Sequence, residues 1–204
     1  PALLSEELPV ADCPPVRVRL MGEDFVAFRD SSGKVGLLDA HCPHRLADLF
    51  FGRNEEGGLR CVYHGWKFSV AGEILDMPSE PQGSPMRCNP NLRAKAYPVR
   101  EAGGIIWAYL GPQESMPALP DMEFMSLPPQ NVHVSKCLMK CNYLQALEGS
   151  IDTAHLTFLH HSMAPMEKDV FAVGNLQEFG DADGAPRFFC EDTDFGMRIS
   201  ARRD

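Results

Sequence analysis

The sequence predicts an α+β fold in which a mostly antiparallel β domain precedes the start of an α+β domain. Short runs that alternate apolar and polar residues, separated by turn residues, fill the first 110 positions. Proline then becomes dense over residues 111–130, where five prolines exclude regular structure. Beyond residue 141 the apolar residues recur every three to four positions, which is typical of a helix.

The first part of the chain contains most of the predicted strands. Residues 16–20 alternate apolar and charged side chains, the pattern of a half-buried strand. Residues 24–29 and 34–38 follow, and the polar turn 30–33 between them ends in glycine, which predicts a hairpin. By the same criteria we expect further strands at residues 58–63, 66–70, 73–75 and 104–110.

The second part combines strands with one helix. Strands are expected at residues 131–140, 187–190 and 195–200. A helix is expected between the first two of these, with Asn142 as its N-cap. Its apolar stripe consists of Leu144, Leu147, Ile151, Ala154 and Phe158.

The proline-dense segment also predicts how the chain is divided, because such segments mark linkers between domains. We expect a first domain over residues 1–115, a linker over residues 116–130 and a second domain over residues 131–204.

Composition and charge exclude several classes of protein. The 204 residues carry a net charge of −9, which argues against nucleic acid or an anionic membrane as the main partner. No apolar run reaches the roughly 18 residues of a membrane-spanning helix. An odd number of cysteines, seven, without an apolar leader favours a reducing compartment, so we expect a cytoplasmic protein.

Two short segments each combine a cysteine with a histidine. The first contains Cys42 and His44, the second contains Cys61 and His64, and sixteen residues separate them. Zinc accepts two cysteines and two histidines, but its usual motifs pair like ligands. A Rieske [2Fe–2S] cluster needs two thiolates on one iron and two imidazoles on the other, which these segments would supply together. The spacing favours the cluster over zinc and leaves both open.

Acidic residues and histidines also gather on the predicted helix. Glu148, Asp152 and His155 are spaced i, i+4 and i+7, which would place them on one helical face beside the apolar stripe. Partly buried carboxylates and imidazoles need partners or a metal ion. His160 would lie about 140° from His155 in a regular helix, so we predict a π-bulge or a break between these two histidines. The alternative is an amphipathic helix whose histidines are incidental.

Both motifs resemble those of one protein family. The Cys–His segments, including the run HGW at residues 64–66, resemble the Rieske iron–sulfur domain. The residues 148–160 resemble the iron-binding motif of Rieske non-haem iron ring-hydroxylating oxygenases, and the two motifs occur in the order typical of that family. The runs HGWKF and MPSEP are most similar to the phthalate-dioxygenase-like group, whose substrates are mostly aromatic acids and aryl ethers.

The resemblance implies a role for each residue of the two motifs. Cys42 and Cys61 would bind one iron of the cluster, and His44 and His64 the other. His155 and His160 would bind a mononuclear Fe(II), with a carboxylate completing the site. Asp152 would be the catalytic residue that links His155 to a Rieske histidine of a neighbouring subunit.

The resemblance also implies partners. Electrons would pass from NADH through a flavin and iron–sulfur reductase to the cluster and then to Fe(II), which activates O2 for hydroxylation, dihydroxylation or O-demethylation of an aromatic substrate. The family works as a ring of subunits, so a homotrimer or a multiple of it is expected. The alternatives are a Rieske ferredoxin that only carries electrons and a domain stabilised by zinc.

The sequence departs from the family pattern in two respects. The third iron ligand of the family is an acidic residue far downstream, and no carboxylate after His160 lies at that distance. We therefore expect a chain that is truncated within the catalytic domain and also at its N-terminus. Leu46 stands where a glycine is expected after the first Cys–His segment.

Two further groups of residues lie near the predicted cluster. Trp66 is expected to pack beside the cluster, with an electron-transfer role as the alternative. The basic residues Arg45, Arg60 and Lys67 are expected to be solvated loop charges, with contact to an acidic reductase as the alternative.

Overall fold

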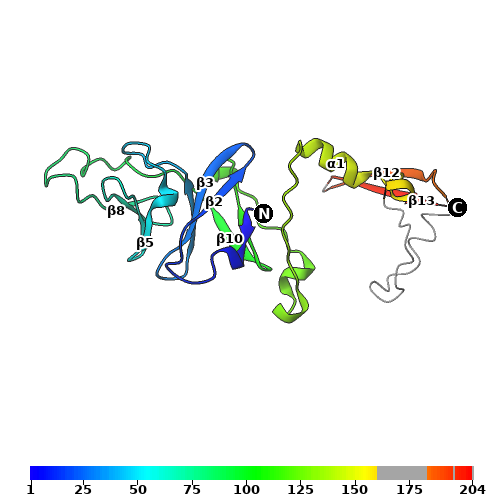
Figure 1. The fold of residues 1–204 in the computed structure, drawn as a ribbon, viewed down its shortest axis with the longest axis horizontal. Helices are drawn as coiled ribbons and strands as arrows, with labels where there is room; N and C mark the ends of the chain where they lie inside the picture. Colours follow the sequence, from blue (N-terminus) through cyan, green and yellow to red (C-terminus); the bar gives the residue numbers. More distant parts are fainter. Residues whose placement is uncertain (160–182, 195, 204) are drawn as a thin grey trace. The chain divides into compact units, whose positions relative to one another are not determined.

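The computed structural model describes residues 1–159, 183–194 and 196–203. The chain forms two compact units, Pro1–Lys136 and Cys137–Asp204 (Figure 1). The proline-dense segment falls within the first unit, in which it forms three short 3-10 turns, Gln113–Ser115, Glu123–Ser126 and Pro129–Asn131. The domain limits expected from the sequence stay a prediction.

The first unit is built from three antiparallel sheets. The first sheet has the order β1 (Leu3–Leu4), β11 (Ile105–Ala108), β10 (Val99–Ala102). The second has the order β2 (Val16–Leu20), β3 (Glu23–Arg29), β4 (Val35–Asp39), β9 (Ala96–Tyr97). The third has the order β5 (Arg53–Glu55), β6 (Gly58–Arg60), β7 (Lys67–Phe68), β8 (Ile74–Asp76). Every strand predicted up to residue 110 is confirmed.

The β3–β4 hairpin shows why this region could be predicted. The buried carboxylate of Asp30 accepts hydrogen bonds from the backbone N–H groups of Ser32 and Lys34, both at 2.9 Å. Gly33 closes the turn with a φ of +84°, a conformation that glycine adopts without steric cost. The turn chemistry is local, so the sequence alone specifies it.

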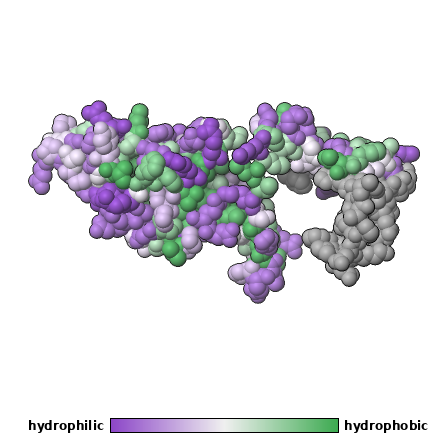
Figure 2. All heavy atoms as spheres, in the orientation of Figure 1, coloured by the Kyte–Doolittle hydropathy of each residue, from purple (hydrophilic) through white to green (hydrophobic). Residues whose placement is uncertain are grey.

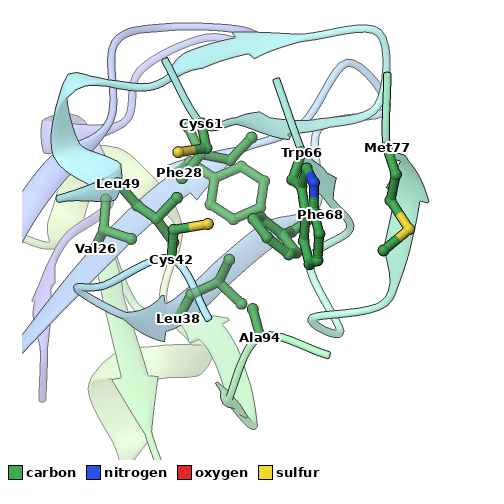
Figure 3. Packing of buried hydrophobic residues seen from close by; sticks show 11 residues of the cluster. Val26, Phe28, Leu38, Cys42, Leu49, Cys61, Trp66, Phe68, Met77 and Ala94 are labelled. Atoms are coloured by element: carbon green, nitrogen blue, oxygen red, sulfur yellow. The ribbon is translucent and has the colours of Figure 1, made fainter. Parts of the chain in front are cut away.

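A hydrophobic core with members from the second and third sheets holds the two cysteines of the predicted site (Figure 3). Its buried members outside that site are Val26, Phe28, Leu38, Leu49, Leu59, Trp66, Phe68, Met77 and Ala94. Full burial of one such large side chain contributes about 1.5–3 kcal/mol. The segments that carry Cys42 and Cys61 are therefore anchored in one of the two hydrophobic cores of this unit.

The strand predicted at residues 131–140 is wrong. After the turn that ends at Asn131, residues 132–140 form no strand. Alternating valines resemble a strand, but a strand also needs a partner for its backbone groups. The segment is held by side chains instead, because Lys136 Nζ donates to both carboxylate oxygens of Glu7 at 2.6–2.7 Å.

The second unit contains α1 (Tyr143–Ile151), α2 (Leu156–Leu159), β12 (Arg187–Thr193) and β13 (Gly196–Arg202). The last two strands pair as an antiparallel hairpin, which confirms the strands predicted there. Asn142 caps α1 as predicted, because its Oδ1 accepts from the Leu144 N–H at 2.9 Å. None of the helices within the described residues is long and apolar enough to cross a membrane.

The single helix predicted over residues 144–158 is wrong in its centre. The α1 helix ends at Ile151, and Asp152 is extended with φ −71° and ψ 127°. The carboxylate of Asp152 then accepts from the backbone N–H groups of Ala154 at 2.8 Å and His155 at 3.2 Å, which starts the next turn. A break therefore precedes His155, and the distortion predicted between His155 and His160 stays a prediction. His160 lies outside the described residues.

Large apolar side chains cover much of the surface of the second unit (Figure 2). In the β12–β13 hairpin, paired residues share a face, and one face carries Phe188, Cys190, Met197, Ile199 and Ala201. No described residue of this unit is buried. The contrast with the first unit is plain, because all buried residues among those described lie at or before Ile106.

Candidate metal centres

Two loops with the same backbone geometry carry the Cys–His segments. In the first loop (residues 42–47), the Cys42 N–H donates to the Ala47 carbonyl at 2.8 Å and the Cys42 carbonyl accepts from the Leu46 N–H at 2.9 Å. In the second loop (residues 61–66), the equivalent bonds of Cys61 run to the Trp66 carbonyl at 2.8 Å and from the Gly65 N–H at 3.0 Å. Each loop is thus closed on its cysteine by two backbone hydrogen bonds.

The fifth residue of each loop has a left-handed backbone. Leu46 has a φ of +55° and Gly65 a φ of +75°. This explains why a glycine is expected at Leu46: the loop needs a conformation that costs a residue with a Cβ about 1–2 kcal/mol. The first loop adopts that conformation with leucine in place.

The two cysteines are buried and close together. Each is 2% exposed, and both side chains point into the same space beside Phe28 and Leu49 (Figure 3). Both are free thiols. Burial raises the pKa of the Cys42 thiol to about 11, and the neighbouring Cys61 adds to that rise. A thiolate, the form that binds a metal, therefore needs nearby positive charge at this position.

The two histidines of the loops face each other. The ring centroids of His44 and His64 lie 4.5 Å apart with an interplanar angle of 68°. The Nδ1 atom of His44 is buried and has no hydrogen-bond partner among the described residues. Burial, followed by the neighbouring His64 ring, lowers the pKa of His44, which favours the neutral imidazole with a lone pair available. An orphaned ring nitrogen in a loop that also carries a buried thiol is the observation that fits a metal group best.

The donor set matches a two-iron cluster. Each loop offers one thiol and one imidazole, as a Rieske [2Fe–2S] cluster requires. Within the described ranges, no group of three or more His, Cys, Asp or Glu side chains is arranged to hold a single metal ion. A [2Fe–2S] cluster does not require one, because each of its irons takes two protein ligands.

Arg60 supports the second loop through a hydrogen bond to its backbone, a role that the sequence did not reveal. Its Nη1 donates to the Gly65 carbonyl at 2.7 Å and to Asp76 Oδ2 at 2.8 Å, and its Nε donates to Glu55 Oε1 at 2.7 Å. The side chain is only 13% exposed. Lys67 is buried as well and donates to Glu56. The expectation of solvated loop charge is therefore wrong for Arg60 and Lys67 and fits Arg45, which is exposed.

In the second unit, the structure brings Asp152 and His155 together across the helix break. Oδ2 of Asp152 lies 2.9 Å from Nδ1 of His155. The backbone N–H of Ala154, followed by His155, lowers the pKa of Asp152, so this carboxylate is ionised at neutral pH. Glu148 does not share a helical face with them because the helix ends first, and its side chain accepts from Gln145 at 3.0 Å.

Arg203 ties the helix break to the C-terminal hairpin of the same unit, which sequence reasoning also missed. Its guanidinium donates to the carbonyl oxygens of Thr153 and Asp183 and to the hydroxyl of Thr157, the last at 3.1 Å. The residues after Asp152 are therefore fixed by a side chain about 50 positions away. No periodicity in the sequence signals such a contact.

Two family models match the chain. Residues 1–98 match the Rieske [2Fe–2S] domain, and residues 108–204 match the "LigXa C-terminal domain like" family. The sequence is 42% identical, over its whole length, to the phthalate 4,5-dioxygenase oxygenase subunit of Pseudomonas putida. It is 51% identical over 99% of its length to the 3-chlorobenzoate-3,4-dioxygenase oxygenase subunit of Comamonas testosteroni. The chain spans 46% and 45% of these relatives, respectively.

Solved structures show the same likeness. A crystal structure of dicamba monooxygenase with non-heme iron and dicamba is 30% identical, with a TM-score of 0.52, and the match covers 59% of this chain and 35% of that one. The oxygenase in a reduced complex with ferredoxin, from carbazole 1,9a-dioxygenase, is 26% identical with a TM-score of 0.60. That match covers 77% of this chain and 40% of the oxygenase.

Proposed function

The chain belongs to the phthalate-dioxygenase-like family of Rieske oxygenase alpha subunits, and from this premise we propose that it is part of an enzyme that uses O2 to oxidise an aromatic acid. The proposed reactions are hydroxylation, dihydroxylation or O-demethylation. The observation that carries the proposal is the pair of matching loops that bring two buried thiols and two imidazoles to one place.

We assign the residues of the two loops to a Rieske [2Fe–2S] cluster, which supplies single electrons when bound. Cys42 and Cys61 would hold one iron and His44 and His64 the other. The protein excludes water from the thiols through the surrounding core. Desolvation of His44 lowers its pKa, which favours the neutral imidazole, the form that binds a metal.

His155 and His160 are the proposed ligands of a mononuclear iron, and Asp152 is the proposed catalytic connector to a Rieske histidine of a neighbouring subunit. The contact of Asp152 with Nδ1 of His155 at 2.9 Å supports this assignment. With Nδ1 engaged, the ring presents Nε2 to a metal, and the carboxylate fixes the ring orientation. A mononuclear iron supplies the site for O2 when bound.

The names of the relatives narrow the proposed substrate. Phthalate and 3-chlorobenzoate, from which two relatives take their names, are aromatic carboxylates, as is dicamba in the structure that contains it. We therefore propose an aromatic acid, with electrons from NADH delivered through a flavin and iron–sulfur reductase. A related oxygenase forms a complex with ferredoxin, which supports an iron–sulfur electron donor. We propose a homotrimer or a multiple of it as the assembly.

The test of this function begins with the cluster. The chain, loaded anaerobically with iron and sulfide, should hold two irons and two sulfides and give the paramagnetic signal of a reduced Rieske centre. Replacing His64 with Ala should remove the visible absorption of the cluster. His41→Ala is the matched control, because His41 is exposed, beside Asp39. An unchanged spectrum in His64→Ala, or tight binding of zinc in place of iron, would overturn the proposal.

A further inference from the structure

The two histidines of the candidate cluster site have different neighbours. The His44 ring stacks on the indole of Trp66, with 4.4 Å between ring centroids and an interplanar angle of 3°. Trp66 is fully buried. The His64 ring meets His44 at a steep angle, and its other ring neighbour is Tyr63, which is 64% exposed. One imidazole therefore lies flat against the interior, and the other is flanked by an exposed surface side chain.

Hydrogen bonding alone does not orient His44. A metal-bound imidazole usually donates its second ring N–H to a carboxylate, a carbonyl or water, and this fixes the ring plane. Within the part of the chain that the structure describes, the buried Nδ1 of His44 has no hydrogen-bond partner. The His44 ring meets His64 at a steep angle and lies parallel to Trp66, and the parallel contact is the one that fits the plane of this ring.

Trp66 is itself held from two sides. Figure 3 shows its indole between Phe68 and Met77 in the core. Its Nε1–H donates to the hydroxyl of Ser79 at 3.2 Å. The segment that carries Ser79 is fixed at its start by the ion pair of Asp76 with Arg60 at 2.8 Å. A defined chain of contacts thus runs from Ser79 through the indole to His44.

We infer that Trp66 is a positioning residue for His44: it sets the plane of this imidazole at the cluster, and Ser79 holds Trp66 in place. The inference rests on the proposed role of His44 as a cluster ligand. It predicts two inequivalent histidine ligands, one orientationally locked by the interior and one free to respond to the surface. Trp66 acts through His44 and touches no substrate, so its effect appears in the magnetic coupling of one histidine to the cluster.

Pulsed EPR of the reduced, cluster-loaded 204-residue chain, labelled with 15N-histidine, tests the inference. The wild-type protein should show two distinct imidazole nitrogen couplings. Trp66→Leu removes the flat ring and should shift or broaden one coupling while leaving the other unchanged. Trp66→Phe keeps a flat ring and should restore most of the wild-type value. Ser79→Ala should broaden the same coupling by a smaller amount.

The chain offers a matched control for the tryptophan. Trp107 is the second tryptophan of the sequence, and its Nε1–H donates to the Ala102 carbonyl at the same 3.2 Å. It lies in β11, outside the core of the candidate site. Trp107→Leu should leave both couplings unchanged, so a change common to the two tryptophan variants reports general destabilisation and overturns the inference.

The outcomes separate the inference from the proposed function. If the wild-type chain forms no [2Fe–2S] cluster, the proposed function fails. If Trp66→Leu and Ser79→Ala bind the wild-type amount of iron and both couplings stay unchanged, the positioning role fails and the ligand assignment stands. If Trp66→Leu does not fold, Trp66→Phe and Ser79→Ala decide, and unchanged couplings in both overturn the inference.

Discussion

The first loop and the second loop follow the same backbone path with different sequences. Both close on a cysteine and place their fifth residue at positive φ, yet that residue is Leu46 in one loop and Gly65 in the other. The difference is the space around the Cβ position. A Cβ on Gly65 would lie 2.7 Å from Cγ of Pro78, whereas the Leu46 side chain is 72% exposed. Steric room decides where glycine is required, and backbone conformation alone does not.

The loops also differ in their support. Gly65 of the second loop receives a hydrogen bond from the nearly buried guanidinium of Arg60. Beside the first loop, Asp48 pairs with Arg17, whose side chain is more than half exposed. Exposed ion pairs contribute little to stability, typically about 0–1 kcal/mol. The second loop is therefore the more rigidly held of two similar structures.

The largest expected effect is loss of the cluster, and it tests whether both loops supply ligands. Cys42→Ala and Cys61→Ala should each abolish cluster binding, because one thiolate cannot hold an iron in the proposed arrangement. Visible absorption and iron content measure the loss. Cys13→Ala is the control, since Cys13 is buried but lies outside both loops. A variant that keeps its cluster would remove that cysteine from the ligand set.

The next-largest effect is a loss of turnover, and it tests the proposed iron site independently of the two loops. In an active oxygenase that contains this chain, Asp152→Ala should leave both metals bound and reduce turnover by about 10–100-fold or more, because a partner of a metal ligand is lost. Asp152→Asn can keep an acceptor for the Ala154 N–H while replacing the oxygen that faces His155 by a donor, so it tests the contact with His155. Glu191→Gln serves as the control, because Glu191 is an exposed carboxylate of the same unit outside the motif. Wild-type turnover in Asp152→Ala would refute the connector role.

The steric difference between the loops predicts a specific loss of stability. Gly65→Ala should lower the free energy of unfolding by about 2–3 kcal/mol, because backbone strain and the contact with Pro78 add. Gly57→Ala isolates the strain: Gly57 has a φ of +79° and nothing within 4 Å of an added Cβ. We expect about 1–2 kcal/mol there. Urea unfolding measures both, and equal losses would contradict the steric explanation.

The opposite substitution in the first loop should stabilise the protein. Leu46→Gly removes the strain of the left-handed backbone but raises the conformational entropy of the unfolded chain. We therefore expect the free energy of unfolding to rise by up to about 1 kcal/mol. Urea unfolding of the same series measures it. A loss of stability on this substitution would mean that the exposed leucine makes a contact that outweighs its backbone strain.

The smallest effect concerns the support of the second loop. The Arg60 guanidinium hydrogen-bonded to Asp76 lowers the pKa of that carboxyl below its ordinary value. Because the folded-state pKa is depressed, the stabilisation is present above the unfolded pKa of about 3.9 and is lost as pH falls through the folded value. Asp76→Asn should lower the free energy of unfolding by about 0.5–1 kcal/mol at pH 7, and the difference should vanish as pH falls through the folded-state pKa of Asp76. A difference that persists at low pH would refute this origin.

Local chemistry made most of the first unit predictable. Alternating side chains and the Asp30 turn specify the β3–β4 hairpin without reference to other parts of the chain. The ligand spacing likewise pointed to two facing loops. The segment 131–140 failed because a strand depends on a partner, and alternation says nothing about one. The position of the helix break also could not be read from periodicity, because the carboxylate of Asp152 decides it through hydrogen bonds.

The supporting contacts of the site were the least predictable part. Arg60 and Ser79 support the site because the fold brings distant segments together. Arg60 then reaches Asp76, and Ser79 accepts from the indole of Trp66. In the sequence these are an arginine and a serine without a motif. Only the packing of the loops shows what they support.

Asp152 uses most of its acceptor capacity within its own unit. A carboxylate has about four acceptor positions. Within the described part of the chain, three are occupied: one by the N–H of Ala154, and two by the N–H and the ring of His155. In the proposed role, the remaining lone pair can accept from a single donor. Each Asp152 can therefore join one imidazole in addition to that of His155. A protomer with one such acceptor and one cluster can therefore contact one neighbour through Asp152 and one neighbour through its cluster. Protomers joined in this head-to-tail manner close into a ring or continue as a filament, and they cannot branch.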